Sequence, residues 1–283
     1  MAINKVEFSG NTLIDLTGDS VTPETLALGA TAHDASGQQI QGTLDVESFQ
    51  TIFDNAGYHN SVFRGKSLGT EFTSEQSAQI VAGTFKDMFV GDYWTINNVV
   101  YRIAGFDIML HDGDTELTKH HVIIVPDKNM YSHVMNDTNV TTGGYYNSKM
   151  KQSGLDNALA TIKTAFGESH VLTRRALLVN AVNGDNASGW AWYDSQIDLM
   201  TERQVYGSPA WGQSSHNGYD ASSEYSKFPL FTLAPQFICN RNWYWLRDIR
   251  SSTFFARVYS YGNANNDGVA SDAAGVRPFS LIA

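Results

Sequence analysis

Apolar residues that recur at helical spacing predict two amphipathic helices. The first begins at Thr73, which opens the capping-box sequence Thr73-Ser-Glu-Gln76, and ends before Gly91. Its apolar face consists of Ala78, Val81, Phe85 and Met88. The second ends at Gly167, and its apolar face consists of Leu155, Leu159, Ile162 and Phe166. A third, shorter helix is predicted over Thr173–Val182.

Short apolar runs between polar loops predict strands in other parts of the chain. The runs are Trp94–Phe106, His121–Val125, Phe228–Leu233, Trp243–Leu246, Phe254–Tyr259 and Val276–Ile282. Few helices among many short strands and long polar loops are typical of an α+β domain. We therefore predict the α+β fold class for this protein.

The first 45 residues differ in composition from the remainder. Neither Trp nor Tyr occurs before Tyr58, and all six Trp lie beyond residue 90. The pattern predicts a strand within Val6–Leu16, a helix that starts at Thr22-Pro23-Glu24, and a second strand over Ile40–Leu44. So short a segment, without Trp or a disulfide, rarely supports a core of its own.

This contrast predicts three parts. We expect a small strand-rich docking or oligomerisation module over residues 1–45, a linker over residues 46–73 and the α+β domain over residues 74–283. The module would complete its core with other subunits. The alternative is that residues 1–45 form a small appendage packed on the main domain.

The charge and hydropathy of the chain argue against some classes of binding partner. The chain has 19 Lys and Arg against 29 Asp and Glu, a net charge of −10. Nucleic-acid binding needs clustered Lys and Arg, so we predict no such partner. No apolar run approaches the roughly 20 residues that span a bilayer, and the first residues lack a secretory signal pattern. We expect no membrane insertion, and either a cytoplasmic protein or one that leaves the cell by another route.

Known catalytic and cofactor motifs are absent from the sequence. It contains no G-x-G-x-x-G or P-loop sequence, no G-x-S-x-G elbow and no H-E-x-x-H helix. We therefore predict neither an enzyme nor a bound cofactor. The single cysteine, Cys239, has apolar neighbours and is predicted to be a buried, inert thiol.

Three places offer ligands to a metal ion. His120 and His121 are adjacent, but neighbours on a strand point to opposite faces. Asp112-Gly-Asp-Thr-Glu116 and Asn263-Ala-Asn-Asn-Asp-Gly268 offer oxygen atoms to calcium. In the second segment, Ala274 stands where a calcium loop has its bidentate Glu. We expect solvated turns at both segments and no metal site.

Residues toward the C-terminus resemble a known group of proteins. Asn242-Trp-Tyr-Trp-Leu-Arg-Asp248 followed by Asp272-Ala-Ala-Gly-Val-Arg-Pro-Phe-Ser-Leu-Ile282 resembles the ending of many phage and prophage proteins. Gly189-Trp-Ala-Trp-Tyr193 and Leu199-Met-Thr-Glu-Arg-Gln-Val-Tyr-Gly207 resemble the same group. More distantly, these segments are similar to the C-type lectin fold of the formylglycine-generating-enzyme type. That fold also serves as the display scaffold of retroelement-diversified phage receptor-binding proteins.

A second resemblance lies at the start of the chain. Val21-Thr-Pro-Glu-Thr25, Gly29-Ala-Thr-Ala-His-Asp34 and Gly42-Thr-Leu44 resemble a short module found at the start of phage tail and other virion proteins. Together the two resemblances imply a C-type lectin-like domain in a virion protein that is made in the bacterial cytoplasm. They imply that residues 1–45 contact other virion proteins. They also imply a homotrimer, because phage fibres commonly repeat around three-fold axes.

The resemblance implies binding rather than catalysis. The enzyme branch of the fold depends on catalytic cysteines, and Cys239 lies outside any matching motif. The sugar-binding triplets of animal C-type lectins are absent, so calcium-dependent sugar binding is not implied. The leading hypothesis is a tail-fibre, baseplate or head-fibre adhesin that binds a bacterial surface protein or glycan. An architectural virion component, such as a capsid decoration protein, is the alternative. A surface-polysaccharide hydrolase, the third hypothesis, lacks a clear acid–base pair.

The lectin-like fold also implies where a ligand would bind. A closing strand at Arg277-Pro278, with Phe279, Leu281 and Ile282 inward, would lie beside Trp243–Leu246. The segment Arg247–Ala274, rich in Ser, Tyr, Asn and Arg, would be displayed on the outer face. Candidate contact residues are Trp243, Arg247, Phe254, Arg257, Tyr259, Tyr261, Asn263 and Asn265.

The alternation of side chains along a strand predicts which of these candidates share a face. It predicts that Tyr259 and Tyr261 share one side of the strand and that Val258 takes the other. Trp243 and Phe254 are the candidates best suited to the core. The alternative is that the two tyrosines merely fill the surface of a hairpin.

Overall fold

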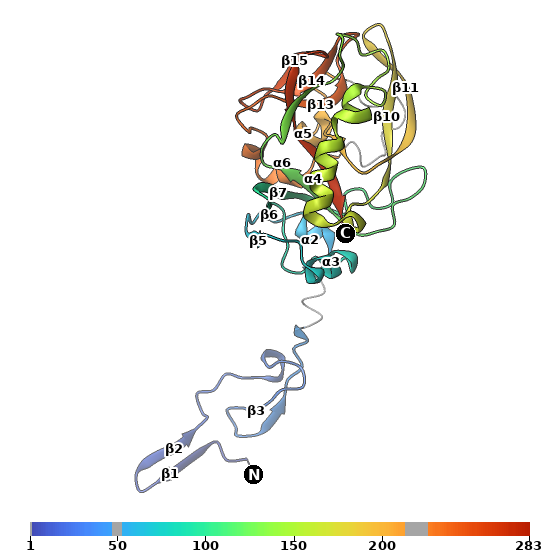
Figure 1. The fold of residues 1–283 in the computed structure, drawn as a ribbon. Helices are drawn as coiled ribbons and strands as arrows, with labels where there is room; N and C mark the ends of the chain where they lie inside the picture. The colour runs from blue at the N-terminus through green and yellow to red at the C-terminus, as the bar shows by residue number, and fades with distance from the viewer. Residues whose placement is uncertain (1, 47–52, 213–225) are drawn as a thin grey trace. The chain divides into compact units, whose positions relative to one another are not determined.

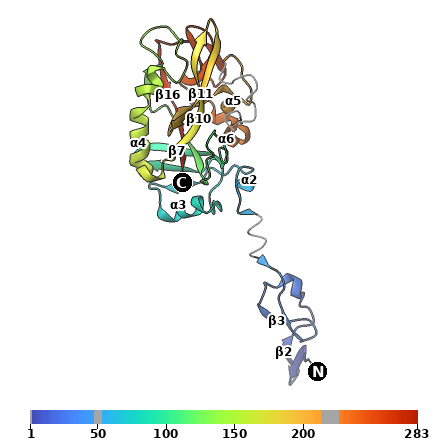
Figure 2. The ribbon, with the colours of Figure 1, turned by 90° about the vertical axis from the view of Figure 1, so that its right-hand side faces the viewer.

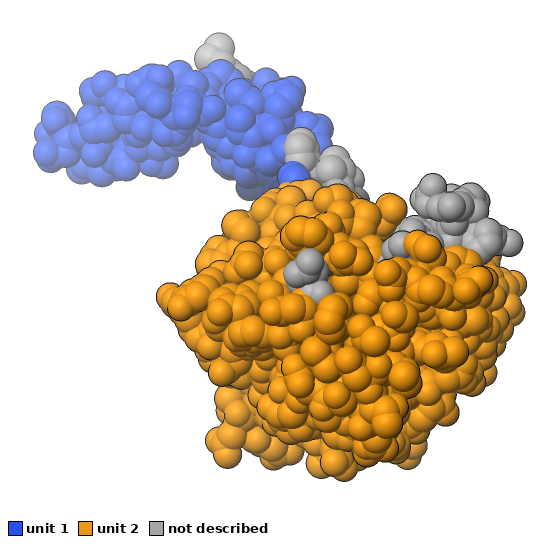
Figure 3. Space-filling model, turned by 90° about the horizontal axis from the view of Figure 1, so that it is seen from above, with its two compact units in different colours: residues 1–54 blue, residues 55–283 orange. Residues whose placement is uncertain are grey.

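The computed structural model describes residues 2–46, 53–212 and 226–283. The chain divides into two compact units, Met1–Asp54 (unit 1) and Asn55–Ala283 (unit 2). Figure 1 traces the elements of each along the chain, and Figure 3 colours unit 1 blue and unit 2 orange. Part of the expected linker belongs to unit 2. It contributes the short helix α2 (Ala56–His59) and strand β5 (Ser67–Gly69).

Within residues 2–45, unit 1 forms two short hairpins and one helical turn. Strands β1 (Lys5–Phe8) and β2 (Asn11–Asp15) pair antiparallel, as do β3 (Thr31–His33) and β4 (Gln39–Gln41). The predicted helix is the three-residue 3-10 turn Pro23–Thr25.

The turn between β1 and β2 explains why one predicted strand became two. Ser9 and Gly10 both have positive φ, at 52° and 80°, as a two-residue hairpin turn requires. Within residues 2–46, Gly42 alone is buried. This agrees with the expectation that unit 1 has no core of its own.

A six-stranded sheet forms one layer of unit 2. In spatial order its strands are β12 (Asp198–Leu199), β17 (Pro278–Ile282), β8 (Val122–Pro126), β7 (Val99–Phe106), β6 (Tyr93–Ile96) and β5. The predicted run Trp94–Phe106 is the hairpin β6–β7. Its turn residues Asn97 and Asn98 have φ of 50° and 65°, which asparagine tolerates and hairpins require.

A five-stranded sheet forms the second layer. In spatial order its strands are β15 (Ala264–Val269), β14 (Phe254–Val258), β13 (Tyr244–Ile249), β16 (Ala273–Val276) and β9 (Tyr131–Val134). The expected closing strand Val276–Ile282 is divided at Arg277, whose Nε donates to the carbonyl of Pro126 (2.8 Å). Strand β16 therefore lies beside β13, while β17 joins the other sheet, where Phe279, Leu281 and Ile282 are buried as expected.

Two predicted elements have the opposite type. The expected helix Thr173–Val182 is strand β10 (Arg174–Asn183), which forms a long hairpin with β11 (Asn186–Ser195). The expected strand Phe228–Leu233 is helix α6 (Pro229–Leu233), which begins at a proline. Both segments are short apolar runs, and periodicity alone does not separate strand from helix in such runs.

The two long amphipathic patterns do form helices. Helix α3 (Ser74–Val81) has the predicted Thr73 capping box, but it ends early because Gly83 adopts φ of +70°. Phe85 and Met88 reach the core from the irregular segment that follows. Ala78 and Val81 are exposed and the helix buries Ser77 and Ile80 instead, so the predicted apolar face is wrong within α3.

Helix α4 (Asp156–Phe166) follows a short π-helical turn, η2 (Met150–Gly154), and ends at Gly167. Figure 2 shows α4 alongside the strands of unit 2. The Phe166 ring contacts Trp94 (5.5 Å between centroids) and Tyr101 (5.2 Å) on the inner face of the six-stranded sheet. The fold is thus mixed α/β and rich in strands.

Besides η2, α4 and α6, the described part of the second half of the chain contains three further short helical elements. Helix α5 (Glu202–Tyr206) carries its own capping box, in which the Thr201 side chain accepts from the amide of Gln204. The single 3-10 turns are η3 (Glu168–His170) and η5 (Pro235–Phe237).

Candidate functional site

Four of the predicted contact residues form one aromatic and cationic cluster, the tyrosine shelf (Trp243, Arg257, Tyr259 and Tyr261). Strands β13 and β14 are antiparallel, with Tyr244 opposite Val258, so the start of β13 lies beside the end of β14. The Arg257 guanidinium carbon lies 3.9 Å from the centre of the Trp243 ring. The Tyr259 ring is 4.4 Å from Trp243 and 5.5 Å from Tyr261.

Arg257 is the buried member of the shelf, and hydrogen bonds fix its guanidinium. It is only 6% exposed, and its Nε donates to Asn265 Oδ1 (3.0 Å) while Nη2 donates to Asp267 Oδ1 (2.8 Å). A guanidinium on an aromatic face is a favourable cation–π contact, strongest when water is excluded. The oxygen atoms considered for calcium thus accept hydrogen bonds from Arg257 instead.

Tyr261 is the exposed member of the shelf, at 73% of its surface. It lies in a tight turn in which the Gly262 amide donates to Tyr259 O (2.8 Å) and the Tyr259 amide donates to Asn263 O (2.9 Å). Gly262 has φ of +93°, and a Cβ there would lie 3.0 Å from Cys239 Cβ. The turn therefore requires glycine and rests directly on Cys239.

The rings of Tyr259 and Tyr261 are neighbours, and Val258 is buried. Both tyrosines follow β14 rather than belonging to it, so a turn, and not the expected strand alternation, brings their rings together. Cys239 is half-buried, not buried as expected, and its Sγ donates to Ser260 O (3.1 Å).

The four other predicted contact residues lie at different places in unit 2. Asn265 joins the shelf through Arg257, and Asn263 is exposed in the adjoining turn. Phe254 is half-buried at the far end of β14, opposite Val269. Arg247 is only 3% exposed, so the expectation that it belongs to a displayed surface is wrong.

The segment Arg247–Ala274 is accordingly not one displayed face. Strand β13 lies between β14 and β16, and all of its residues from Tyr244 to Ile249 are buried. Four of the five residues of β14 are buried as well. Outward display is confined mainly to the turns that connect these strands.

Arg247 belongs to a buried network of charges centred on Asp198. The Asp198 carboxylate accepts from Lys151 Nζ (2.8 Å), Arg174 Nη2 (2.8 Å) and Ser195 Oγ (2.8 Å), and Arg247 Nη1 lies 4.0 Å away. Burial by itself would raise the pKa of Asp198, but the three cationic side chains outweigh it and lower the pKa from 3.8 to about 2. The network joins β10, β12, β13 and the turn before α4.

A second buried carboxylate connects the segments that carry the resemblance. Glu202 is fully buried, and its Oε2 accepts from the amides of Ala210, Trp211 and Gly212 at 2.8 to 2.9 Å. The amide of Glu202 donates to Asp248 Oδ2 (2.8 Å). Glu202 and Asp248 therefore organise the interior, whereas Trp243 of the same motif belongs to the shelf.

The side chains that were weighed as metal ligands do not converge. His120 Nδ1 lies 2.6 Å from Asp107 Oδ2, and His121 is fully buried. Asp114 accepts from Arg175 Nε (2.7 Å), so the acidic segment Asp112–Glu116 is also paired internally. Among the residues that the structure describes, no group of three or more His, Cys, Asp or Glu is arranged to hold a metal ion.

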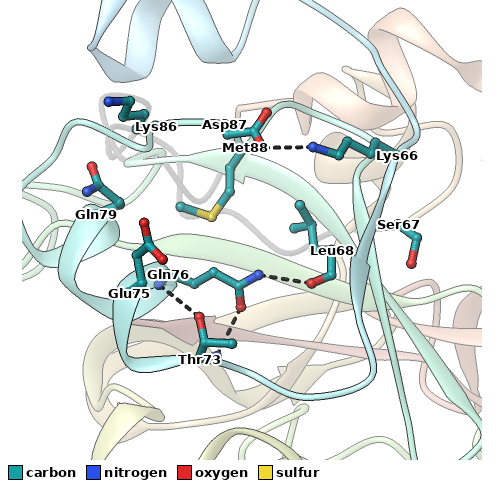
Figure 4. Close-up of a pocket in the computed structure, with 10 residues that line it drawn as sticks. All are labelled: Lys66, Ser67, Leu68, Thr73, Glu75, Gln76, Gln79, Lys86, Asp87 and Met88. Atoms are coloured by element: carbon teal, nitrogen blue, oxygen red, sulfur yellow. Dashed lines mark hydrogen bonds and ion pairs between the residues drawn. The ribbon is translucent and has the colours of Figure 1, made fainter.

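A polar pocket of about 390 Å³ lies between β5 and α3 (Figure 4). Its Lys66 and Asp87 form an ion pair (2.7 Å). Its central side chain, Gln76, accepts from the Thr73 amide and Trp94 Nε1 and donates to Leu68 O. Because the protein itself uses these groups, the pocket is a weaker candidate than the shelf.

Comparisons with known proteins add no information about this site. No protein-family model, curated protein or solved structure matches the chain. Within the described ranges, no helix has the length and apolar character needed to cross a membrane. The candidate site is therefore defined by its own contacts: a fixed arginine, a half-buried tryptophan and two adjacent tyrosines, one of them largely in water.

Proposed function

We propose that this protein is a structural protein of a bacteriophage particle that binds the host surface through the tyrosine shelf. Unit 2 would be the C-type lectin-like display domain, and unit 1 would attach the chain to the particle. The resemblance of residues 242–248 and 272–282 to phage proteins motivates the biological setting. The function is binding without catalysis.

The exposed Tyr261 carries the proposal. A large aromatic side chain that stands in water on a firm support offers contact area with little loss of freedom on binding. Its support is the turn fixed by Gly262 and Cys239. Tyr259 continues the same aromatic surface, and the neighbouring Asn263 offers an adaptable hydrogen-bonding amide.

The apolar surface of unit 1 supports its role in assembly. Large apolar side chains that are at least half exposed or nearly so are Ile3, Phe8, Leu13, Ile14, Leu28 and Val46. Exposed apolar surface of this extent on so small a unit is typical of an interface with other protein. Other virion proteins and further copies of unit 1, as in a homotrimer, both fit this surface.

An architectural role without receptor binding is the second candidate. Unit 1 favours it, because assembly alone accounts for the exposed apolar side chains. The two candidates differ only in what the tyrosine shelf does. An experiment on the shelf therefore separates them.

Tyr261→Ala tests the proposal. Truncation of a dominant contact residue costs roughly 2 kcal/mol or more, about 30-fold in affinity, so attachment of the purified protein to host cells should weaken to that extent. Since Tyr261 is exposed, unfolding stability should change by no more than about 0.5 kcal/mol.

Tyr58→Ala is the matched control, because it removes a tyrosine of unit 2 that lies outside the shelf. It should leave attachment unchanged. Binding of Tyr261→Ala at the strength of the unaltered protein would contradict the proposal and favour the architectural role.

A further inference from the structure

We propose that unit 2 carries a second binding site, separate from the tyrosine shelf, that takes the pyranose rings of a neutral oligosaccharide. The site is a hollow of about 510 Å³ on the outward face of the six-stranded sheet. We call it the aromatic hollow, and its three rings are Phe63, Tyr93 and Phe237.

Strand register puts the floor of the aromatic hollow on one face of the sheet. Tyr93 of β6 is opposite Arg102 of β7, and Thr95 is opposite Val100. All four line the hollow, whereas the intervening Trp94 and Tyr101 are fully buried in the core. Alternation therefore separates a packed inner face from an aromatic outer face within the same two strands.

Arg102 fixes two of the three rings. Its guanidinium carbon lies 4.8 Å from the centre of Tyr93 and 4.2 Å from that of Phe237. The guanidinium itself is held by both carboxylate oxygens of Asp127 (2.7 and 2.6 Å) and by the carbonyl of Gly91. Every one of these groups is in place before any ligand arrives.

Phe63 is held by glycine on the opposite side. A Cβ at Gly91 would lie 2.2 Å from the Phe63 ring, and Gly91 has φ of +88°, so only glycine allows this packing. The ring nevertheless remains 36% exposed, and its centroid lies 5.9 Å from that of Phe237. An aromatic ring that is exposed yet fixed is suited to binding, because little freedom is lost when a ligand covers it.

The chemistry of the hollow favours an uncharged ligand. Arg102 is neutralised by Asp127, and Arg64 at the rim is neutralised by Asp87 (2.7 Å) and Asp92 (2.6 Å). What remains are aromatic faces together with the hydroxyl groups of Tyr93 and Thr95. A pyranose ring matches this combination, with apolar C–H groups on its faces and hydroxyl groups around its edge.

An extended peptide fits less well. Peptides that bind sheets add to an edge, where main-chain groups are unpaired. The hollow lies over the face of β6 and β7, whose main-chain groups pair with each other. Side-chain rings are therefore what it offers, and these favour a sugar.

Saturation-transfer NMR on the full chain tests the proposal, with cellotetraose, maltotetraose and chitotetraose as probes. At least one should receive saturation from the protein, and Phe63→Ala should weaken its binding about tenfold or more. Phe63→Leu keeps the apolar volume without the ring and should weaken binding likewise, which guards against loss of folding in the alanine variant.

Two controls keep the test specific. Leu233→Ala removes a similarly exposed apolar side chain outside the hollow and should leave binding unchanged. Tyr261→Ala should also leave it unchanged, because that residue belongs to the tyrosine shelf. The proposal is overturned if none of the three sugars binds at about 10 mM, a concentration that detects very weak complexes. It is also overturned if binding survives both Phe63 variants, if it depends on Tyr261, or if a proline-rich peptide binds the hollow when the sugars do not.

Discussion

Units 1 and 2 place their apolar residues in opposite ways. Unit 2 collects apolar side chains from both sheets and from α4 into one continuous core. Unit 1 buries only Gly42 among residues 2–46 and leaves side chains such as Phe8 and Leu13 in water. A two-stranded hairpin is marginally stable by itself, so we expect unit 1 to depend on contacts with other molecules, whereas unit 2 has a core of its own. Under the proposed function, stability and assembly would be properties of different parts of one chain.

Deletion of residues 1–54 is the strongest way to break this comparison. The remaining unit 2 should unfold cooperatively at the same temperature as the full chain, because its core is unchanged. It should fail to enter particles and should be monomeric by light scattering, whereas the full chain should be trimeric. Normal incorporation into particles, or a trimer formed without unit 1, would show that assembly does not reside there.

Acidification tests the stability of unit 2, in which the Asp198 carboxylate is buried among cationic side chains. Its pKa is lower in the folded chain, so the carboxylate stabilises unit 2 fully above the ordinary value of 3.8, and that contribution is lost as pH falls through about 2. The fall in pKa corresponds to about 2 kcal/mol of unfolding free energy. Denaturant unfolding of the protein at pH 5 and at pH 2 measures it.

Asp198→Asn is the control for that measurement. At pH 5 it should be the less stable protein by several kcal/mol, since it leaves three buried cations without their anion. Between pH 4 and pH 2 it should lose about 2 kcal/mol less than the unaltered chain. Equal losses in the two proteins would show that Asp198 does not govern the acid response.

The smallest expected effect comes from substitutions at two equally exposed apolar residues, one in each unit. They compare the two surfaces most directly. Leu13 of unit 1 is 62% exposed and Val81 of unit 2 is 61% exposed. Leu13→Ser should weaken self-association by about 1 kcal/mol, or roughly fivefold, if its side chain is covered in the assembly. Val81→Ser should leave association unchanged and alter stability by no more than about 0.5 kcal/mol. Sedimentation of both variants measures the difference, and equal behaviour would remove the distinction between the two surfaces.

The fold was predictable where a pattern was long. Helix α4 matches its prediction because four apolar residues share a face over more than three turns. The pattern predicts the hairpin β6–β7 as one run, because the turn at Asn97-Asn98 lies between two apolar segments and depends on the positive φ of both asparagines. Strand β10 and helix α6 were assigned the opposite type because each is a short apolar run whose conformation depends on distant partners.

The candidate site was predictable where residues are near in sequence. Trp243 directly precedes β13, Arg257 lies on β14, and Tyr259 and Tyr261 follow β14. These residues are close in sequence, and composition alone brings them to attention. Arg247 was misplaced because its anion, Asp198, lies on a strand far away in the sequence. The aromatic hollow was missed for the same reason, since Phe63 and Phe237 meet only in the folded chain.

The position of β17 has a consequence for how the protein is made. Its residue Ser280 pairs with Ile124 of β8, and Phe279 pairs with Asp198 of β12, so the six-stranded sheet is completed by a strand that is synthesised long after its neighbours. At ~5–20 residues per second, the ribosome takes roughly 8–30 s to pass from one partner to the other. During that interval β8 presents an unpaired apolar edge, which is the kind of surface on which nascent chains aggregate. We therefore expect the yield of this protein to depend on protection of β8 during translation. Slow elongation between residues 126 and 278 would prolong the exposure of this edge and lower the yield.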